Sequence, residues 1–332
     1  MLDFNVKLKE SLYLIYLNIM EKSRLKDLVI AITYQCNSRC RMCNIWRENL
    51  PGSLKAEDYS KIPTGLSNIN ITGGEPFLRT DLEQILFTIH KINPKARVVI
   101  STNGFATGLI IEQVEKIKKF IPRLGIAISL DGIGTKHDEI RGVEGGFNKV
   151  MATVNGLKKI GLKKLRLAFT LGDYNTEELI KVYNLSRELK VEMTLAAVHS
   201  GEKYFKANNI IEKKLEMAKA LDQLISRELK SFSVKRWIRA YFAFGLREFI
   251  LTGRRILPDY SGQENIFIDP WGDIYPSDIS VQKIGNLLTG FKNLSPLINE
   301  SPSWMICTAR TAIRKHWFKF IIWLIKRRSY KE

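Results

Sequence analysis

The stretch Asn68-Ile-Asn-Ile-Thr-Gly-Gly-Glu-Pro76 joins a short run of strand-forming residues to a turn that begins with two glycines. Short apolar, β-branched runs bounded by Gly or Pro are typical of buried strands. Five more such runs occur, at residues 28–34, 97–101, 125–130, 164–170 and 191–198. Together they predict six buried parallel strands.

Amphipathic stretches separate these runs, at residues 81–92, 108–120, 146–160 and 176–189. Strands that alternate with helices about every 30 to 40 residues indicate βα units. The predicted fold class is therefore α/β, with a partial (β/α)6 TIM-like barrel as its core. Long helical segments at 208–229 and 234–251 and a β-like hairpin at 266–275 follow. They predict a C-terminal α+β extension.

The change of pattern divides the chain into four expected parts. These are an N-terminal helical segment at residues 1–25, the barrel core at 26–205, a helical linker and extension at 206–310, and a basic amphipathic tail at 311–332. A chain of 332 residues with 45% hydrophobic content fits one barrel plus an appendage.

The chain carries 52 Lys and Arg against 34 Asp and Glu, a net charge of +18. This excess predicts an anionic partner, which charge alone leaves open among nucleic acid, an acidic protein and anionic lipid. Charged residues such as Asp3, Lys7 and Glu10 interrupt the N-terminus, so it lacks the apolar core of a signal peptide. With four cysteines and no apolar run long enough to span a bilayer, we expect a cytoplasmic protein.

Three of the cysteines lie in the segment Cys36-Asn-Ser-Arg-Cys40-Arg-Met-Cys43. Cytosolic cysteines at such tight spacing bind metal or do redox work more often than they form disulfides. A structural zinc site would need a fourth ligand nearby, and the remaining Cys307 is far along the chain. The spacing favours an iron–sulfur cluster with one iron left without a Cys ligand, and leaves a zinc site or a chance arrangement open.

Polar and glycine-rich turns follow the predicted strands. In a parallel barrel or sheet, ligands bind at the carboxyl ends of the strands, so we expect these turns to line one mouth together with the cysteines. They are Gln35-Cys36, Gly73-Gly74-Glu75-Pro76, Thr102-Asn103-Gly104, Asp131-Gly132, Gly172-Asp173 and His199-Ser200-Gly201.

The cysteine segment and the Gly73-Gly74-Glu75-Pro76 turn, in this order, resemble the signature of the radical S-adenosylmethionine (radical SAM) enzymes. Further similar segments are Ser101-Thr102-Asn103-Gly104, Ser129-Leu130-Asp131-Gly132 and His137-Asp138-x-x-Arg141-Gly142. The resemblance covers residues 28–200 and implies a [4Fe-4S] cluster held by Cys36, Cys40 and Cys43.

The resemblance also implies a site for S-adenosyl-L-methionine, whose amine and carboxylate would chelate the fourth iron. The backbone of Gly73 and Gly74, with Glu75 and Pro76, would surround the methionyl ammonium, and Arg141 would pair with the carboxylate. Ser129 and Asn103 would bond the ribose, and Met42 would lie beside the adenine.

The C-terminal part resembles the SPASM and twitch extensions of the same family, which hold auxiliary clusters. The similar segments are 268–276, 284–287 and 304–310. Where the pattern has cysteines, this chain has Ser277, Ser303 and, ahead of Gly262, Asp259. Only Cys307 matches, so we expect the extension without its cluster and Cys307 as a buried small apolar residue.

The catalytic residues that act on the substrate stay unknown at this stage. His199, Asp173 and Tyr174 follow strands and are candidates for acid, base or radical relay. The alternative for all three is loop capping and hydrogen bonding.

Two basic segments could contact the anionic partner. Residues 230–258 mix Arg and Lys with aromatic residues, which we interpret as a helix packing its aromatic face rather than as a nucleic-acid site. The tail, in which every charge from Arg310 to Lys331 is positive, suits either an interfacial helix on anionic lipid or a helix docked on the barrel.

The leading hypothesis is a radical SAM enzyme that cleaves S-adenosylmethionine reductively and abstracts hydrogen from a peptide or protein. The alternatives are a radical SAM enzyme acting on a lipid or cofactor precursor at the inner face of the membrane, and a non-catalytic iron–sulfur protein for electron transfer or sensing. An acidic flavodoxin or ferredoxin is the expected electron donor, because the chain is basic. Nucleic acid is the disfavoured partner.

Overall fold

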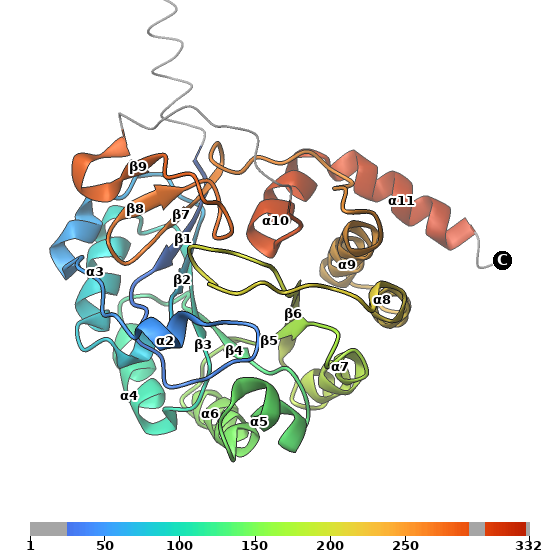
Figure 1. The fold of residues 1–332 in the computed structure, drawn as a ribbon, viewed down its shortest axis with the longest axis horizontal. Coiled ribbons are helices and arrows are strands. Elements are labelled where there is room, and N and C mark those ends of the chain that lie inside the picture. Colours follow the sequence, from blue (N-terminus) through green and yellow to red (C-terminus); the bar gives the residue numbers. More distant parts are fainter. Residues whose placement is uncertain (1–24, 292–302, 330–332) are drawn as a thin grey trace, which may run out of the picture.

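The computed structural model describes residues 25–291 and 303–329. The N-terminal helical segment predicted at 1–25 lies almost entirely outside the described residues. Figure 1 shows a central sheet ringed by helices, with the C-terminal helices to one side.

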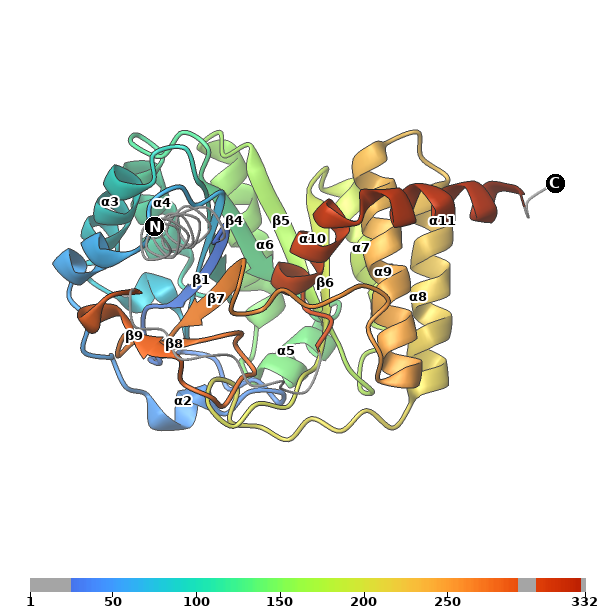
Figure 2. The same ribbon diagram turned by 90° about the horizontal axis from the view of Figure 1, so that it is seen from above.

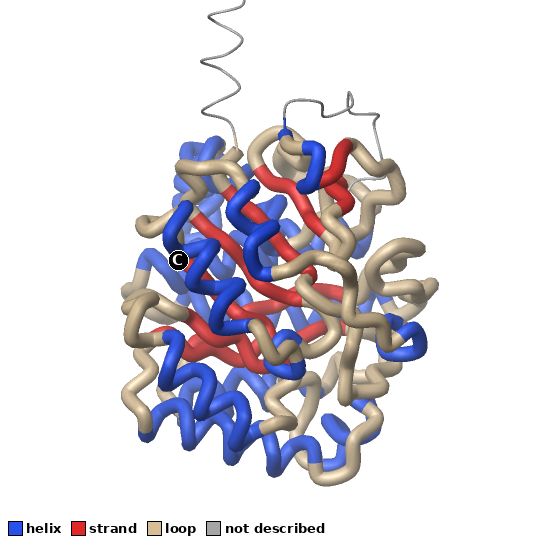
Figure 3. The backbone as a smooth tube through the Cα atoms, turned by 90° about the vertical axis from the view of Figure 1, so that its left-hand side faces the viewer, coloured by secondary structure: helices blue, strands red, loops and turns tan. Residues whose placement is uncertain are grey.

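Six strands follow one another in parallel and confirm the predicted α/β core. They are β1 Asp27–Ala31, β2 Asn68–Thr72, β3 Arg97–Thr102, β4 Gly125–Ser129, β5 Lys164–Leu171 and β6 Glu192–Ala197. Each pairs with the next along the chain, as in a partial barrel. In Figure 3 these strands cross the middle of the molecule with helices on their outer side.

Helices lie between and after these strands, and the longer ones cover the outer face of the sheet. They are α2 Ile45–Glu48, α3 Leu82–Ile92, α4 Thr107–Ile117, α5 Thr135–Arg141, α6 Gly146–Lys159, α7 Glu178–Glu188, α8 Lys214–Leu229 and α9 Val234–Thr252. Short 3-10 helices lie at η1 Ala56–Lys61, η2 Pro76–Leu78 and η3 Leu287–Thr289. The sequence pattern did not indicate α5, because its seven residues are too few to show helical periodicity.

The two faces of the strands carry different side chains. In β5, Leu165, Leu167 and Phe169 are buried and pack on the outer helices. The alternate residues Arg166, Ala168 and Thr170 face inward and stay partly exposed. Barrels are normally filled by bulky branched residues, so small and polar inward residues leave this interior hollow.

The C-terminal part adds to the same sheet. The β7 strand Asn265–Ile268 pairs in parallel with β1, and β8 Asp273–Tyr275 and β9 Gly285–Asn286 continue in antiparallel fashion. The predicted hairpin is therefore present, and its first strand extends the edge of the barrel sheet. The boundaries of the four parts stay a prediction.

Two helices follow this hairpin, α10 Ile306–Lys315 and α11 Trp317–Ser329. In α10, Arg310 and Thr311 bond the buried carboxylate of Asp27 in β1. On α11, Phe320 and Leu324 are buried, whereas Trp317, Phe318 and Ile322 are exposed. In Figure 2 α11 lies on the opposite side of the molecule from α2. No helix among the described residues is long and apolar enough to cross a membrane.

Candidate functional site

A cavity of about 250 Å³ lies at the carboxyl ends of the parallel strands, and we call it the cysteine cavity. Most of the predicted site residues line it. They are Cys36, Met42, Gly73, Gly74, Asn103, Ser129, Arg141 and His199, together with Cys40 and Cys43. The structure thus brings together residues that are up to 163 positions apart in the chain, 36 to 199.

The cysteine segment follows β1 and rests on the end of α5. The backbone N–H groups of Arg39 and Arg41 donate to the carbonyls of Arg141 and Ile140, both at 2.9 Å. Ser38 Oγ lies 3.0 Å from Cys40 Sγ and donates to the Arg141 carbonyl. These bonds fix the segment without using the thiols of Cys36 and Cys43.

The two glycines of the β2 turn allow a close approach of the cysteine segment. The Gly74 N–H donates to the Thr33 carbonyl at 2.7 Å. A Cβ at Gly73 would lie 2.3 Å from that carbonyl oxygen, and one at Gly74 would lie 2.1 Å from the Gln35 carbonyl oxygen. Gly73 also has φ +139°, which L side chains rarely adopt. Glycine is therefore needed at both positions so that this turn can pack against the backbone of Thr33 and Gln35. The sequence had suggested only that glycine allows a ligand to approach.

Burial makes the thiols of Cys36 and Cys43 weaker acids than an exposed cysteine. It raises the pKa of Cys36 and of Cys43 to about 12 in each case. The Nη1 atom of Arg141 lies 3.5 Å from Cys40 Sγ, and Asn103 Nδ2 lies 3.9 Å from Cys36 Sγ. Both donors therefore lie close to sulfur atoms, and cysteines bind metal as thiolates.

Glu75 is turned away from the cavity and braces the end of β3. Its carboxylate accepts hydrogen bonds from the Thr102 hydroxyl at 2.9 Å and from the Asn103 N–H at 2.7 Å. Burial raises the pKa of Glu75 to about 7, against the lowering effect of these bonds. Pro76 starts η2 behind the same turn. The placement of Glu75 and Pro76 beside a methionyl ammonium stays a prediction.

Arg141 is held in place by a buried carboxylate. Its Nε and Nη2 atoms each lie 2.6 Å from Asp131 Oδ2. Burial alone lowers the pKa of Arg141, but Asp131 and Cys40 raise it above its ordinary value. The guanidinium therefore stays charged at the cavity wall, and its role as carboxylate partner stays a prediction.

Among the three catalytic candidates, only His199 lines the cysteine cavity. Its Nε2 atom is buried without a hydrogen-bond partner in the described part of the chain, and burial lowers the pKa of its imidazole. Asp173 instead accepts hydrogen bonds from the backbone N–H groups of Glu212 and Lys213, ahead of α8. The ring of Tyr174 stacks under the Arg41 guanidinium at 4.9 Å.

The sequence did not reveal three residues that line the cavity from later segments, Tyr204, Asp278 and Met305. The Tyr204 hydroxyl donates to the Gly73 carbonyl at 2.9 Å and so ties the loop after β6 to the glycine turn. Burial raises the pKa of Asp278 to about 7, and its Oδ1 atom has no hydrogen-bond partner among the residues described. Tyr204 and Asp278 belong to no motif in the sequence, so only tertiary structure could identify them.

The arrangement of the cysteines fits a polynuclear cluster. The three cysteines line one cavity, which many other residues also line. In the part of the chain that the structure describes, no group of three or more His, Cys, Asp or Glu side chains forms a single-ion site. A cluster offers a separate iron to each thiolate, so its ligands need not converge on one point.

Residues 30–186 match the family model described as the radical SAM superfamily. A probable GTP 3',8-cyclase of Sulfolobus acidocaldarius is 30% identical over 184 residues, which are 53% of this chain and 56% of that protein. A second, from Saccharolobus solfataricus, is 27% identical over 226 residues, covering 65% and 68%. The chain thus matches little more than half of the Sulfolobus protein.

Solved structures share the fold at lower identity. The model superposes on anSMEcpe with bound AdoMet and Cp18Cys peptide with a TM-score of 0.58 and 21% identity, over 79% of this chain and 77% of that one. For Streptococcus suis SuiB bound to precursor peptide SuiA, the TM-score is 0.60 at 18% identity, over 82% and 64%. The family match ends at residue 186, so the resemblance of the C-terminal part to SPASM and twitch extensions stays a prediction.

Proposed function

The chain belongs to the radical SAM superfamily, whose cofactors are a [4Fe-4S] cluster and S-adenosylmethionine, and on this premise we propose that Cys36, Cys40 and Cys43 hold the cluster in the cysteine cavity. A reduced cluster held there would supply one electron for the cleavage of S-adenosylmethionine to methionine and a 5′-deoxyadenosyl radical, the species that would abstract hydrogen from the substrate. The protein is then an enzyme of radical chemistry.

The proposal rests on the position of the three cysteines, the glycine turn and Arg141. All of them line the same cavity, at the strand ends where barrels bind their ligands.

These residues have separate roles in binding S-adenosylmethionine. The Gly73 and Gly74 backbone and Arg141 bind the two ends of the methionine moiety, and Ser129 and Asn103 bind the ribose hydroxyls. Met42, which is buried, packs beside the adenine.

Iron and sulfide content after anaerobic reconstitution tests the ligand assignment. We expect about four irons and four sulfides per chain for the wild type and fewer than one for a Cys36→Ala, Cys40→Ala, Cys43→Ala variant. Cys307→Ala is the matched control, because Cys307 is also a partly buried free cysteine but does not line the cysteine cavity. Equal iron in the wild type and the triple variant would overturn the assignment.

For the substrate, the resemblance of the C-terminal part to SPASM and twitch extensions favours a peptide or protein side chain. Two of the solved structures that share the fold have peptides bound, and the hollow barrel leaves room for a substrate next to the cysteine cavity. A second candidate is a lipid or cofactor precursor. Three arginines around the barrel interior favour it, because they suit an anionic small molecule.

Hydrogen transfer can separate these classes. The enzyme is supplied with peptide, lipid and polar small-molecule fractions from deuterated cells, and deuterium is measured in the 5′-deoxyadenosine product. Label arising with the peptide fraction alone supports the first candidate, and label arising with either other fraction supports the second.

The electron donor is proposed to be an acidic flavodoxin or ferredoxin. The net charge of +18 favours association with such a protein, and salt should weaken it. Donor-dependent cluster reduction that is as fast at 0.5 M as at 0.05 M salt would contradict this choice.

A further inference from the structure

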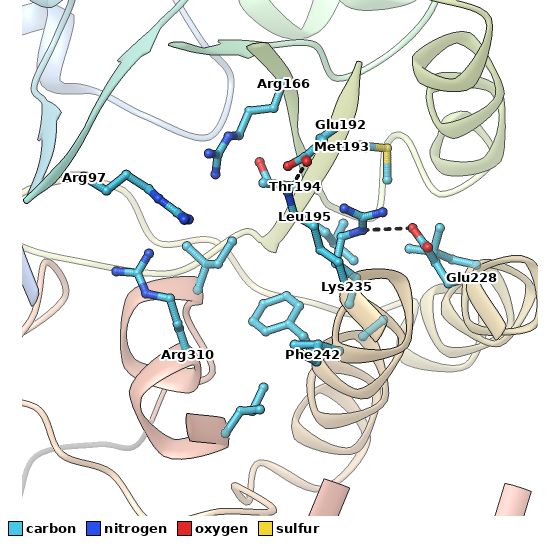
Figure 4. A pocket seen from close by; sticks show the side chains of 16 residues that line it. Arg97, Arg166, Glu192, Met193, Thr194, Leu195, Glu228, Lys235, Phe242 and Arg310 are labelled. Atoms are coloured by element: carbon cyan, nitrogen blue, oxygen red, sulfur yellow. Dashed lines mark hydrogen bonds and ion pairs between the residues drawn. The ribbon is translucent and has the colours of Figure 1, made fainter. Parts of the chain in front are cut away.

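A second pocket, of about 270 Å³, opens at the other end of the strands, and we call it the barrel-bottom pocket. It lies between the first residues of β3, β5 and β6 on one side and helices α9 and α10 on the other. Figure 4 shows Arg97, Arg166 and Arg310 reaching from three separate elements toward one space, with Phe242 across from them.

Positive charge dominates this pocket. Five cationic side chains line it, Arg97, Arg166, Lys235, Arg239 and Arg310, against the carboxylates of Glu192 and Glu228. The carboxylates are already engaged, Glu192 by Lys235 and Glu228 by Arg239 and Arg236. Arg310 and Thr311 share the carboxylate of Asp27, with Arg310 Nη2 at 3.1 Å from Asp27 Oδ2.

Arg97 and Arg166 keep unmatched charge. Neither forms an ion pair with a carboxylate of the described residues. Burial lowers the pKa of Arg166, and its neighbours Arg97 and Arg310 lower it further, against the opposing effect of Glu192. Like charges held together in this way are relieved by a bound anion, and guanidinium forks match the oxygen geometry of a phosphoryl group.

The opposite wall is apolar. It consists of Leu195 of β6, Leu224 of α8, Ile238, Phe242 and Ala243 of α9, and Ile306 and Ile313 of α10. An anion alone would leave this wall unused, whereas an alkyl or isoprenoid chain next to the anionic group would bury it.

The pocket continues into the barrel. An interior cavity of about 180 Å³ shares Arg97, Arg166 and Arg310 with the barrel-bottom pocket. It shares Asn70, Ser101, Thr170 and Ala196 with the cysteine cavity. Small inward residues of β3 to β6 line this interior cavity, which therefore lies between the barrel-bottom pocket and the cysteine cavity.

We propose that the barrel-bottom pocket binds a phosphorylated amphiphile, with its phosphoryl group on Arg97, Arg166 and Arg310 and its hydrocarbon chain against Phe242 and the apolar wall. The binding step stands without the radical chemistry. The further statement that such a ligand is a substrate rests on the proposed function.

Titration calorimetry of the full chain with dodecyl phosphate, below its critical micelle concentration, tests the binding step. We expect saturable binding that weakens tenfold or more in an Arg97→Gln, Arg166→Gln double variant. Arg254→Gln, which removes an exposed arginine outside the pocket, should bind as the wild type does. Ile238→Asn should weaken dodecyl phosphate severalfold and leave any binding of inorganic phosphate unchanged.

Inorganic phosphate and GTP serve as the comparison ligands. Weaker binding of both than of dodecyl phosphate supports the proposal. If inorganic phosphate bound as tightly as dodecyl phosphate, the proposed contact of the hydrocarbon chain with the apolar wall would be wrong. If GTP bound more tightly and through the arginines, the ligand would be a nucleotide and not an amphiphile. Unchanged affinity of the double variant, folded by its circular dichroism, would overturn the site. None of these outcomes depends on S-adenosylmethionine cleavage, so failure here and failure of the proposed function are separate results.

Discussion

The guanidinium of Arg141 and the carboxylate of Asp131 form a buried ion pair in which Nη2 lies 2.6 Å from Oδ2. Asp131 lies in the loop after β4 and also accepts the Thr170 N–H at 2.7 Å, whereas Arg141 ends α5 and reaches Cys40. This pair therefore couples two strand ends to the cysteine segment.

Asp131→Asn should lower the free energy of unfolding by about 3 kcal/mol, because removal of one partner leaves a buried guanidinium unpaired. Glu139→Gln is the matched control. It breaks the exposed pair between Lys136 and Glu139 on the same helix and should cost less than about 1 kcal/mol. Chemical denaturation measures both, and equal losses would contradict the role of the buried pair.

Gly74→Ala should displace the cysteine segment, since the added Cβ would lie 2.1 Å from the Gln35 carbonyl oxygen. We expect a loss of about 2 kcal/mol or more in stability, together with reduced iron retention after reconstitution. Gly108→Ala is the control, because a Cβ there meets nothing within 4 Å. Wild-type iron retention in Gly74→Ala would contradict the close approach.

The sequence predicted the core strands to within a few residues, because β-branched runs such as Asn68–Thr72 are short and bounded by turns. It also predicted that the cysteine segment and the glycine turn lie at one mouth, because each is a contiguous motif next to a predicted strand. It could not predict that Glu75 turns away from the cavity toward Thr102, or that Tyr204 and Asp278 line the cavity from later loops. Those contacts depend on tertiary packing. The inward direction of Arg97 and Arg166 was likewise hidden, since strand alternation alone does not say which face is hollow.

Asp278 should make stability fall as pH rises. Its folded pKa of about 7 exceeds its value of about 4 in the unfolded chain, so the native state retains a proton that the unfolded state has lost. The titration of Asp278 therefore leaves the free energy of unfolding unchanged below about pH 4 and lowers it by its full amount above about pH 7.

An Asp278→Asn variant should unfold at the same denaturant concentration as the wild type near pH 4 and be more stable by about 2 to 4 kcal/mol near pH 8. The measurement is the difference between the two proteins at each pH, so that other titrating groups cancel. A difference that does not change with pH would contradict the buried, protonated carboxyl.

The α11 helix has one buried side and one exposed side, so the interfacial role on anionic lipid stays a prediction. Phe320 is buried on α9, with its ring 5.6 Å from that of Tyr241. The exposed side carries Trp317 (64% exposed), Phe318 and Ile322 beside basic residues, which suits an anionic lipid surface.

A Phe318→Ser, Ile322→Ser variant should therefore sediment at least fivefold less with phosphatidylglycerol vesicles than the wild type, and neither protein should bind phosphatidylcholine vesicles at 0.15 M salt. Phe232→Ser removes an apolar side chain that is 94% exposed elsewhere and should have no effect. Equal sedimentation of all three proteins would refute a membrane role for α11.

Radical chemistry is tested by measuring the 5′-deoxyadenosine that the anaerobically reconstituted, dithionite-reduced protein forms from S-adenosylmethionine. We expect product from the wild type and from Cys307→Ala, and none above background from the Cys36→Ala, Cys40→Ala, Cys43→Ala variant. A fully loaded wild type that binds S-adenosylmethionine and leaves it intact would contradict the radical chemistry and favour an electron-transfer or sensing protein.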